Sequence, residues 1–197
     1  EIGLKTRTDK SDTDLAIFEN RVKDEIIKTE QIGYQSVYDN AGETNKQGLE
    51  LSTSYDLTST VKIGGAYTYS KFKFDTFNES VGTTLISRDG NYLPFIPENQ
   101  YSIFAAYNIA NGFKTRVTAR TYGSYYMDNA NTQKYEGYDL VTDFMIGYEM
   151  KAHNIQLNVN NLFDKYYAME ASKDTSGNET YKAASSRNTM LTYTYKF

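Results

Sequence analysis

Residues 48–70 read GLELSTSYDLTSTVKIGGAYTYS, and the alternation of apolar and polar side chains in this stretch decides the fold. One phase is apolar or aromatic and includes Leu49 and Leu51, whereas the other is small, polar or charged and includes Glu50. Side chains two residues apart lie on the same face of a β-strand, so this pattern predicts strands with one apolar and one polar face. The short polar link at 58–60 predicts a hairpin between two such strands.

The same alternation recurs at 101–109, 113–121, 139–148, 154–160 and 189–197. The charged residues of all seven runs fall on the polar phase: Glu50, Asp56, Lys62, Lys114, Arg116, Arg120, Asp139, Asp143 and Lys196. A Lys or Arg that faces lipid at the membrane midplane costs about 2–4 kcal/mol, so a membrane barrel requires this exclusion. A soluble sandwich shares it, but Thr, Ala, Gly and Tyr mixed with Leu and Ile favour a lipid-facing wall.

The composition is compatible with a transmembrane β-barrel. Hydrophobic residues make up 39% of the 197 residues, and the mean hydropathy is -0.64. A barrel wall needs only alternate residues to be apolar, and 19 Tyr with 10 Phe suit the interface between lipid and water. The absence of Cys excludes a disulfide framework and a zinc ribbon. A net charge of -4 with scattered cations argues against nucleic acid as a partner.

The pattern predicts an all-β chain with nine strands, at about 1–8, 14–28, 34–57, 61–74, 100–109, 113–126, 137–148, 154–163 and 186–197. The links are short near 9–13, 58–60, 110–112 and 149–153, medium at 127–136, and long near 29–46, 75–99 and 164–185. Tight periplasmic turns and longer external loops are typical of outer-membrane barrels. Bacterial single-chain barrels have an even number of strands, so nine strands predict a fragment.

Two motifs near the end of the chain carry a family resemblance. The first is the run Asn160, Asn161, Leu162, Phe163, Asp164, Lys165, Tyr166 and Tyr167, and the second is the alternating terminus Tyr193, Tyr195 and Phe197. They resemble the penultimate strand and the assembly signature of TonB-dependent outer-membrane receptors. Weaker similarities lie at 40–51, 93–97 and 137–143. The resemblance implies that 1–197 is the C-terminal part of a 22-stranded antiparallel transmembrane β-barrel, without the plug domain and the N-terminal barrel strands.

The resemblance also implies function. It predicts a multi-pass receptor of the Gram-negative outer membrane that imports a ferric siderophore, with haem or cobalamin as alternative substrates and without a cofactor. The implied partners are TonB with its inner-membrane energising complex (through the plug), the metal chelate, outer-membrane lipid and lipopolysaccharide, and the barrel assembly machinery. The alternative is a small complete barrel that acts as an adhesin or structural protein, and the odd strand number argues against it.

Seven residues are candidates for contact with an iron chelate. On one strand, Arg116 and Arg120 project from the polar phase and lead towards the aromatic residues Tyr122, Tyr125 and Tyr126; Arg88 and Tyr92 lie in the long 75–99 loop. Guanidinium groups attract anionic chelates, and tyrosine rings stack on them. The alternatives are that Arg116 and Arg120 pair with neighbouring wall or plug carboxylates, such as Asp139 and Asp143 on the adjacent strand, and that the loop residues are merely solvated.

The sequence offers no catalytic or metal site. His153 is the only histidine and falls in a predicted periplasmic turn. A protease or lipase of the outer membrane would need a nucleophile facing a histidine. We therefore expect neither hydrolysis nor haem ligation from this segment.

Overall fold

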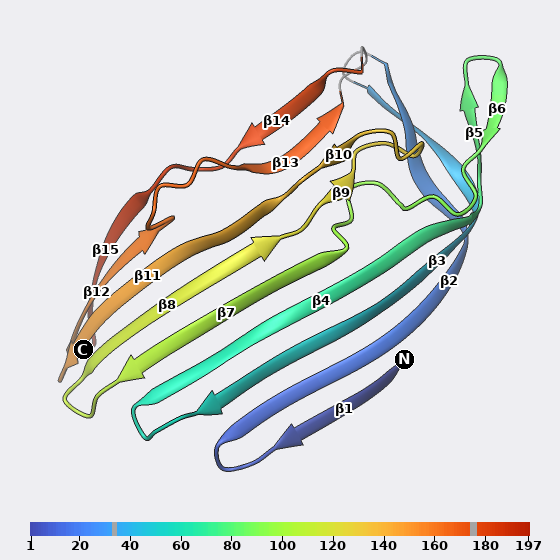
Figure 1. Ribbon diagram of the computed structural model, residues 1–197. Coiled ribbons are helices and arrows are strands. Elements are labelled where there is room, and N and C mark those ends of the chain that lie inside the picture. Colours follow the sequence, from blue (N-terminus) through green and yellow to red (C-terminus); the bar gives the residue numbers. More distant parts are fainter. Residues whose placement is uncertain (33–34, 174–176) are drawn as a thin grey trace.

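The computed structural model describes residues 1–32, 35–173 and 177–197 and contains one large antiparallel sheet of nine strands. The strands lie side by side in the order β1 (Ile2–Arg7), β2 (Ser11–Ile32), β3 (Gln35–Asp56), β4 (Val61–Thr76), β7 (Asn99–Asn108), β8 (Phe113–Tyr122), β11 (Tyr138–Met150), β12 (His153–Asn160) and β15 (Asn188–Tyr195) (Figure 1). The predicted all-β antiparallel architecture and its nine strands are confirmed. No helix in the described part of the chain is long and apolar enough to cross a membrane.

The register of the sheet separates an apolar face from a polar face. Leu51 lies opposite Leu15 on β2 and Tyr67 on β4, and Ile103 lies opposite Ala119 on β8. These side chains form one continuous apolar face because directly paired residues share a side of the sheet.

The polar face carries ion pairs between neighbouring strands. They are Lys5 with Asp14 at 3.4 Å, Arg7 with Asp12 at 2.5 Å, and Lys62 with Asp56 at 3.3 Å. The predicted segregation of charge is therefore present in the register of the sheet.

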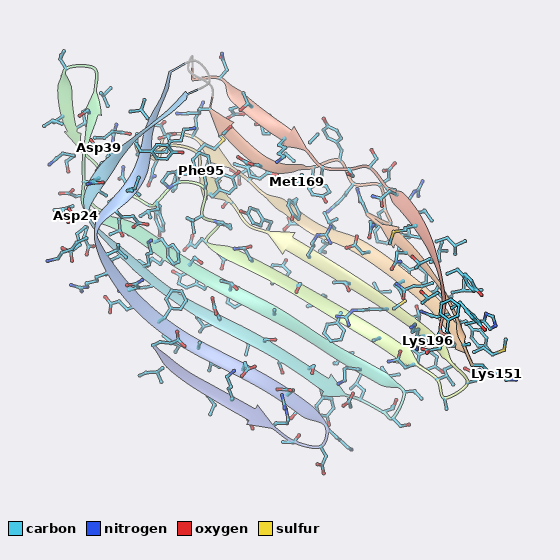
Figure 2. The ribbon with its side chains drawn as sticks, turned by 180° about the vertical axis from the view of Figure 1, so that it is seen from behind. Asp24, Asp39, Phe95, Lys151, Met169 and Lys196 are labelled. Carbon is cyan, nitrogen blue, oxygen red and sulfur yellow. The ribbon has the colours of Figure 1, made fainter. Side chains whose placement is uncertain are left out.

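The long loop expected at 29–46 is wrong, because β2 and β3 continue as paired strands of 22 residues each. Asp24 adopts φ 54° and is skipped in the register, so Lys23 pairs with Glu43 and Glu25 with Ala41. The register is the same on both sides of Asp24, and it shifts only further along, between Lys28 and Glu30. An extra residue in one strand, as at that shift, bends the strand. Both strands bend near Asp24 and rise above the rest of the sheet (Figures 1 and 2).

Two other strand ends also differ from expectation. The strand predicted at 113–126 stops at Tyr122. Gly123 N still donates to the Asn99 carbonyl oxygen at 2.8 Å, and an added Cβ on Gly123 would lie 2.3 Å from that oxygen. β12 ends at Asn160 and not at 163, since Asn161 adopts the left-handed φ of 51°. Both breaks lie at the end of the sheet with the long connections, where they release the chain into additional hairpins.

Three small hairpins form inside the long connections: β5 (Asn78–Val81) with β6 (Thr84–Ser87), β9 (Tyr125–Tyr126) with β10 (Lys134–Tyr135), and β13 (Ala168–Lys173) with β14 (Glu179–Ala183). They gather at one end of the sheet, opposite the tight turns near Lys151 and Lys196 (Figures 1 and 2). The buried hydrophobic clusters lie at this end: Ile27, Ala41, Phe74, Phe77 and Leu93 form one, and Tyr125, Met127, Tyr135 and Ala171 form the other. The sheet faces themselves contribute little core, which fits a wall that borders lipid on one side.

Candidate functional site

Two adjoining hollows on the polar face form the candidate site. The upper hollow, of about 230 Å³, lies between β4, β7, β8 and β11 and is lined by Thr68, Gln100, Ser102, Arg120, Tyr122 and Tyr138, among others. Strand register places these side chains together, because Ser102 pairs with Arg120 and Gln100 pairs with Tyr122. The lower hollow, of about 430 Å³, shares Ala66 and Ser102 with the upper one and extends to Arg116. Together they define a polar track along the wall.

Arg120 of the upper hollow is held by an ion pair. Its Nη1 donates to the Oδ2 of Asp143 on β11. The predicted alternative of pairing with Asp143 is therefore confirmed for Arg120. Asp139 takes a different role, since its backbone carbonyl accepts a hydrogen bond from Lys165 Nζ. Arg120 keeps a fixed direction while 40% of its side chain stays exposed to the hollow.

Arg116 of the lower hollow has no carboxylate partner among the described residues. Its guanidinium carbon lies 3.8 Å from the centroid of the Phe104 ring, and its Nε donates to Thr118 Oγ1 at 3.3 Å. Stacking on an aromatic face orients a guanidinium without neutralising its charge. The predicted pairing of Arg116 with Asp139 or Asp143 is wrong, and its fork of N–H donors is available to the track.

A glycine of β4 makes this stack possible. An added Cβ on Gly64 would lie 2.6 Å from Phe104 Cε1 and 2.6 Å from the Thr53 carbonyl oxygen. The Phe104 ring therefore lies flat against the wall only because residue 64 has no side chain. The sequence reasoning missed Phe104 and Gly64 as site residues. A Gly-Gly pair inside a strand was the available signal, since such glycines mark a close approach of another group.

The predicted tyrosines separate into two groups. Tyr122 lines the upper hollow and stacks on Tyr138, with ring centroids 5.7 Å apart. Tyr125 is only 3% exposed, and its hydroxyl bonds both the carbonyl oxygen of Ala171 at 2.9 Å and its N–H at 2.7 Å. Tyr125 therefore anchors the β13–β14 hairpin to the β9–β10 hairpin, and its hydroxyl is used as both donor and acceptor inside the fold.

The loop candidates Arg88 and Tyr92 are not freely exposed. Arg88 Nε donates to Glu79 Oε2 at 2.7 Å, with only 15% of its side chain exposed, and Asn129 donates to the other oxygen of Glu79 at 2.7 Å. Tyr92 packs against Tyr126 with centroids 5.9 Å apart, and Lys73 Nζ lies 4.6 Å from its ring. Arg88 and Tyr92 are therefore not the exposed loop residues that the sequence predicted, and the alternative of merely solvated side chains does not describe them either. These contacts join the hairpins at this end of the sheet into one packed rim.

The eight-residue motif at 160–167 lies at the upper end of β12, beside the upper hollow. Tyr167 packs on Tyr138 with ring centroids 4.5 Å apart, and Asn161 N donates to Asp143 Oδ1 at 2.9 Å. Leu162 N donates to the Thr142 carbonyl. Phe163 and Tyr166 project outwards, with 72% and 95% of their surface exposed. The motif thus contacts the Arg120 side of the site without lining it.

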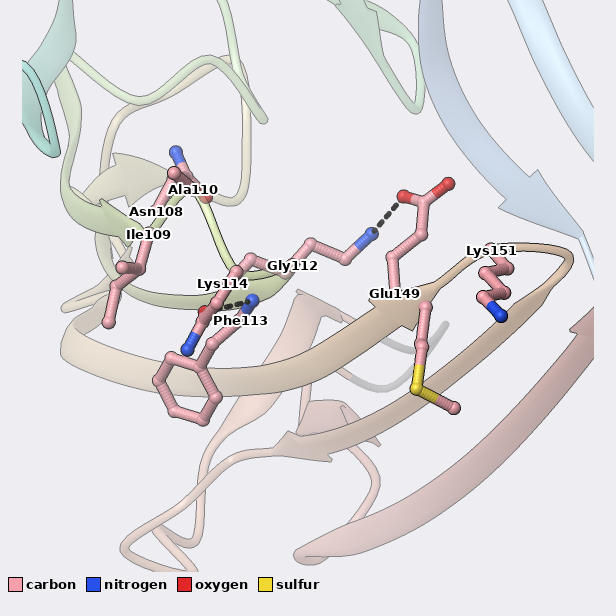
Figure 3. Close-up of a pocket in the computed structure, with 10 residues that line it drawn as sticks. Asn108, Ile109, Ala110, Gly112, Phe113, Lys114, Glu149 and Lys151 are labelled. Carbon is pink, nitrogen blue, oxygen red and sulfur yellow. Dashed lines mark hydrogen bonds and ion pairs between the residues drawn. The ribbon is translucent and has the colours of Figure 1, made fainter.

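The opposite end of the sheet holds a shallow hollow at the tight turns 109–112 and 149–152, and Figure 3 shows Lys114 reaching towards Glu149 there. The Glu149 carboxylate lies 4.0 Å from Lys114 Nζ and 2.9 Å from Lys196 Nζ. This chain of charges ties β8, β11 and the end of β15 together. On the apolar face beside it, His153 Nδ1 lies 2.7 Å from the Tyr193 hydroxyl and the His153 ring packs on Tyr195. Phe197 lies just beyond β15, fully exposed.

Metal binding has no support in the described residues, which contain no group of three or more His, Asp or Glu that could hold an ion. The only histidine contacts tyrosines, and neither hollow places a nucleophile beside it. The track offers guanidinium groups, hydroxyls and aromatic rings for recognition, and the lower hollow also carries the carboxylates of Asp12 and Asp14.

Comparison with known proteins identifies the family. Residues 1–162 match the model of the TonB dependent receptor-like β-barrel. The chain is 31% identical over 134 residues to the ferrioxamine receptor of Yersinia enterocolitica, covering 64% of this chain and 18% of that protein. It is 31% identical over 135 residues to the ferrichrome outer membrane transporter/phage receptor of Escherichia coli, covering 64% and 17%. The chain thus spans about a fifth of the length of these relatives.

The solved structures agree on the fold. The siderophore receptor PiuA of Acinetobacter baumannii superposes with a TM-score of 0.77 at 22% identity, covering 99% of this chain and 27% of that one. The ferric-catecholate import receptor Fiu of Escherichia coli superposes with a TM-score of 0.67 at 25% identity, covering 95% and 25%. The chain belongs to the TonB-dependent receptor β-barrel family, whose members are non-enzymatic transporters in the outer membrane of Gram-negative bacteria.

Proposed function

We propose that residues 1–197 are the C-terminal part of a 22-stranded barrel, in which a plug domain and the remaining strands lie outside this sequence. The sheet ends on β1 and β15, and each edge carries exposed apolar residues, including Ile2 at 82% and Leu191 at 70%. Unpaired backbone groups in lipid cost several kcal/mol each because no water can satisfy them, so both edges need partner strands. The apolar face would then contact outer-membrane lipid and lipopolysaccharide, and the polar face would line the lumen.

We propose further that the complete receptor imports a ferric siderophore. The observation that carries this proposal is the polar track, where Arg120 and Tyr122 line the upper hollow and Arg116 projects into the lower one. Guanidinium groups donate to the oxygen atoms of an iron chelate, and an aromatic ring stacks on its ligand groups. Relatives named as ferrioxamine and ferrichrome receptors support this substrate class.

The seven candidate residues take different roles in this proposal. Arg116, Arg120 and Tyr122 contact the chelate along the track. The remaining four shape the external rim from which the chelate enters: Arg88, Tyr92, Tyr125 and Tyr126. This division follows the contacts of each side chain, because the second group is packed against neighbouring loops.

The partners follow from the same proposal. Import against a gradient would be energised by TonB and its inner-membrane complex, acting through the plug. The barrel assembly machinery would read the terminal residues Tyr193, Tyr195 and Phe197. Deleting Phe197 is expected to lower the amount of assembled receptor without changing the chelate affinity of the molecules that fold; unchanged outer-membrane levels would argue against this role.

Uptake of radiolabelled iron tests the proposed function. Cells without their own siderophore receptors would express the full-length receptor and be given ferrioxamine B, ferrichrome or a ferric catecholate, with and without TonB. We expect uptake of at least one chelate, its loss without TonB, and a reduction in Arg116→Ala. Lys62→Ala is the matched control, since Lys62 is a polar-face cation outside both hollows that pairs with Asp56. Uptake of haem or cobalamin without any iron chelate would contradict the proposal.

A further inference from the structure

The segment after β12 is closed by the side chain of Asn161, which is only 3% exposed. Its Oδ1 accepts a hydrogen bond from Lys165 N at 2.8 Å, and its Nδ2 donates to the Lys165 carbonyl at 2.8 Å. The same Nδ2 reaches the Ser185 carbonyl at 3.4 Å. The side-chain amide of Asn161 thus bonds both backbone groups of Lys165, as a neighbouring strand would. It also contacts Ser185, near the other end of the segment 164–187. The left-handed φ of 51° at Asn161 suits asparagine, which tolerates this conformation better than most residues.

Asp164 closes the same segment by a second contact. Its Oδ1 accepts a hydrogen bond from Arg187 N at 2.7 Å, and its own N–H donates to the Asn161 carbonyl at 2.8 Å. Ala184 N donates to the Tyr167 carbonyl at 3.0 Å one step further along. The two ends of the segment that carries the β13–β14 hairpin are therefore held together at its base.

The base of this segment is attached to the upper hollow through Asp143. Oδ1 of that carboxylate accepts from Asn161 N at 2.9 Å, while Oδ2 holds Arg120. Tyr167, six residues after Asn161, packs on Tyr138, which lines the hollow. Two of the groups that shape the hollow, Arg120 and Tyr138, thus depend on residues fixed by Asn161.

We propose that Asn161 and Asp164 are positioning residues for the chelate site: they hold Tyr167 and Asp143 so that Arg120 and Tyr138 keep the geometry of the upper hollow. This inference rests on the proposed function for the identity of the ligand. In this inference, the 160–167 motif connects Arg120, which faces the lumen, to the base of the β13–β14 hairpin. Neither residue needs to touch the chelate.

Asn161→Gly in the full-length receptor tests the proposal, because glycine keeps the left-handed backbone and removes only the amide. We expect the concentration of chelate at half-maximal uptake to rise by about five- to tenfold, because the side-chain hydrogen bonds that close the segment are lost. The maximal uptake rate per assembled receptor should stay within about twofold of the unmodified protein, because the lost contacts weaken binding of the chelate and leave the later transport step unchanged. Asn161→Asp keeps the acceptor for Lys165 N and should restore part of the affinity.

Asn160→Ala is the matched control, because Asn160 is an adjacent asparagine whose side chain bonds only Asn188 and lies outside the base of the segment. A fall in the amount of receptor with an unchanged half-maximal concentration in Asn161→Gly would show a merely structural role and overturn the inference.

Limited proteolysis of the purified, ligand-free receptor separates this inference from the proposed function. We expect faster cleavage within 164–187 in Asn161→Gly and Asp164→Ala than in Asn160→Ala, whatever the receptor transports. Equal cleavage in all variants would contradict the closure of the segment. Faster cleavage in a receptor that takes up no iron chelate would leave the closure in place and refute only the proposed substrate.

Discussion

Arg116 and Arg120 lie four residues apart on the same strand and the same face, yet the two regions around them differ. In the upper hollow, Arg120 is paired with Asp143, and the same carboxylate accepts a hydrogen bond from Asn161 N. Lower on the wall, Arg116 lies on an aromatic ring that fits against a glycine, and no carboxylate of the described residues pairs with it. The position of a cation along the strand therefore decides which face of the sheet it lies on. The residues on neighbouring strands decide whether its charge is paired within the wall or left unpaired for a ligand.

The comparison assumes that Arg116 and Arg120 face the lumen. A cation placed on the opposite face of the sheet tests that assumption. Leu51→Lys in the full-length receptor would place an ammonium on the apolar face, opposite Leu15 and Tyr67. We expect a loss of about 2–4 kcal/mol and a strong fall in folded receptor, measured as the heat-modifiable band in outer-membrane fractions. Ser52→Lys, one residue further and on the polar face opposite Asp14, should assemble normally. Equal assembly of both variants would contradict the assignment of the faces.

Removing the Asp143 carboxylate tests the difference between the two arginines. Asp143→Ala leaves Arg120 without its counter-ion and Asn161 N without its acceptor. Hydrogen bonds to charged groups contribute about 1.5–3 kcal/mol, so we expect the free energy of unfolding in lipid vesicles to fall by about 2–3 kcal/mol. Asp139→Ala is the control, because that residue contributes its backbone carbonyl to Lys165. A loss of stability no greater than that of Asp139→Ala would contradict a stabilising role for the contacts of Asp143.

Adding a side chain at Gly64 disturbs the region around Arg116. Gly64→Ala would place a methyl group against the Phe104 ring and the Thr53 carbonyl. Overpacking of this kind costs about 1–3 kcal/mol, and the displaced ring would also lose its contact with Arg116. Gly3→Ala is the matched change, because its nearest atom is the Leu15 carbonyl oxygen at an ordinary 3.4 Å. Urea unfolding of the two variants gives the difference; equal midpoints would mean that Phe104 does not lie against the wall.

The smallest expected effect is a pH dependence confined to the external rim. Burial raises the pKa of Asp128, but the ion pair with Lys173 and the donors of Thr132 and Gln133 outweigh it and hold the pKa below its ordinary value. A depressed carboxyl pKa contributes stability that is complete above the unfolded value of about 3.9 and is lost as the pH falls through the folded value. Hydrogen exchange in 127–135 should therefore accelerate below about pH 4. Asp128→Asn should abolish this acceleration, and an unchanged profile would contradict it.

Much of the fold could be predicted because lipid imposes a strict rule on each strand. Leu49, Leu51 and Ile103 had to share a face, and Arg116 and Arg120 had to avoid it. Outside the membrane that rule lapses, so the continuation of β2 and β3 past Asp24 and the three small hairpins left no periodic signal. The contacts of the site were likewise hidden, since Gly64, Phe104 and Arg116 come from three strands and meet only through their register. The pairing of Arg120 with Asp143 could be anticipated because both residues fall on adjacent strands and the same phase.

The binding affinity and stability of Arg116→Ala in the full-length receptor test the central claim most directly. Titration with the transported ferric chelate would give the dissociation constant, and urea unfolding of the same preparation would give the midpoint. We predict a weaker affinity by about tenfold with a loss of stability below about 1 kcal/mol, because an exposed cation–π contact contributes little to folding. An unchanged dissociation constant together with a lower midpoint would show that Arg116 only stabilises the wall, and would contradict the claim that its charge is available to the ligand.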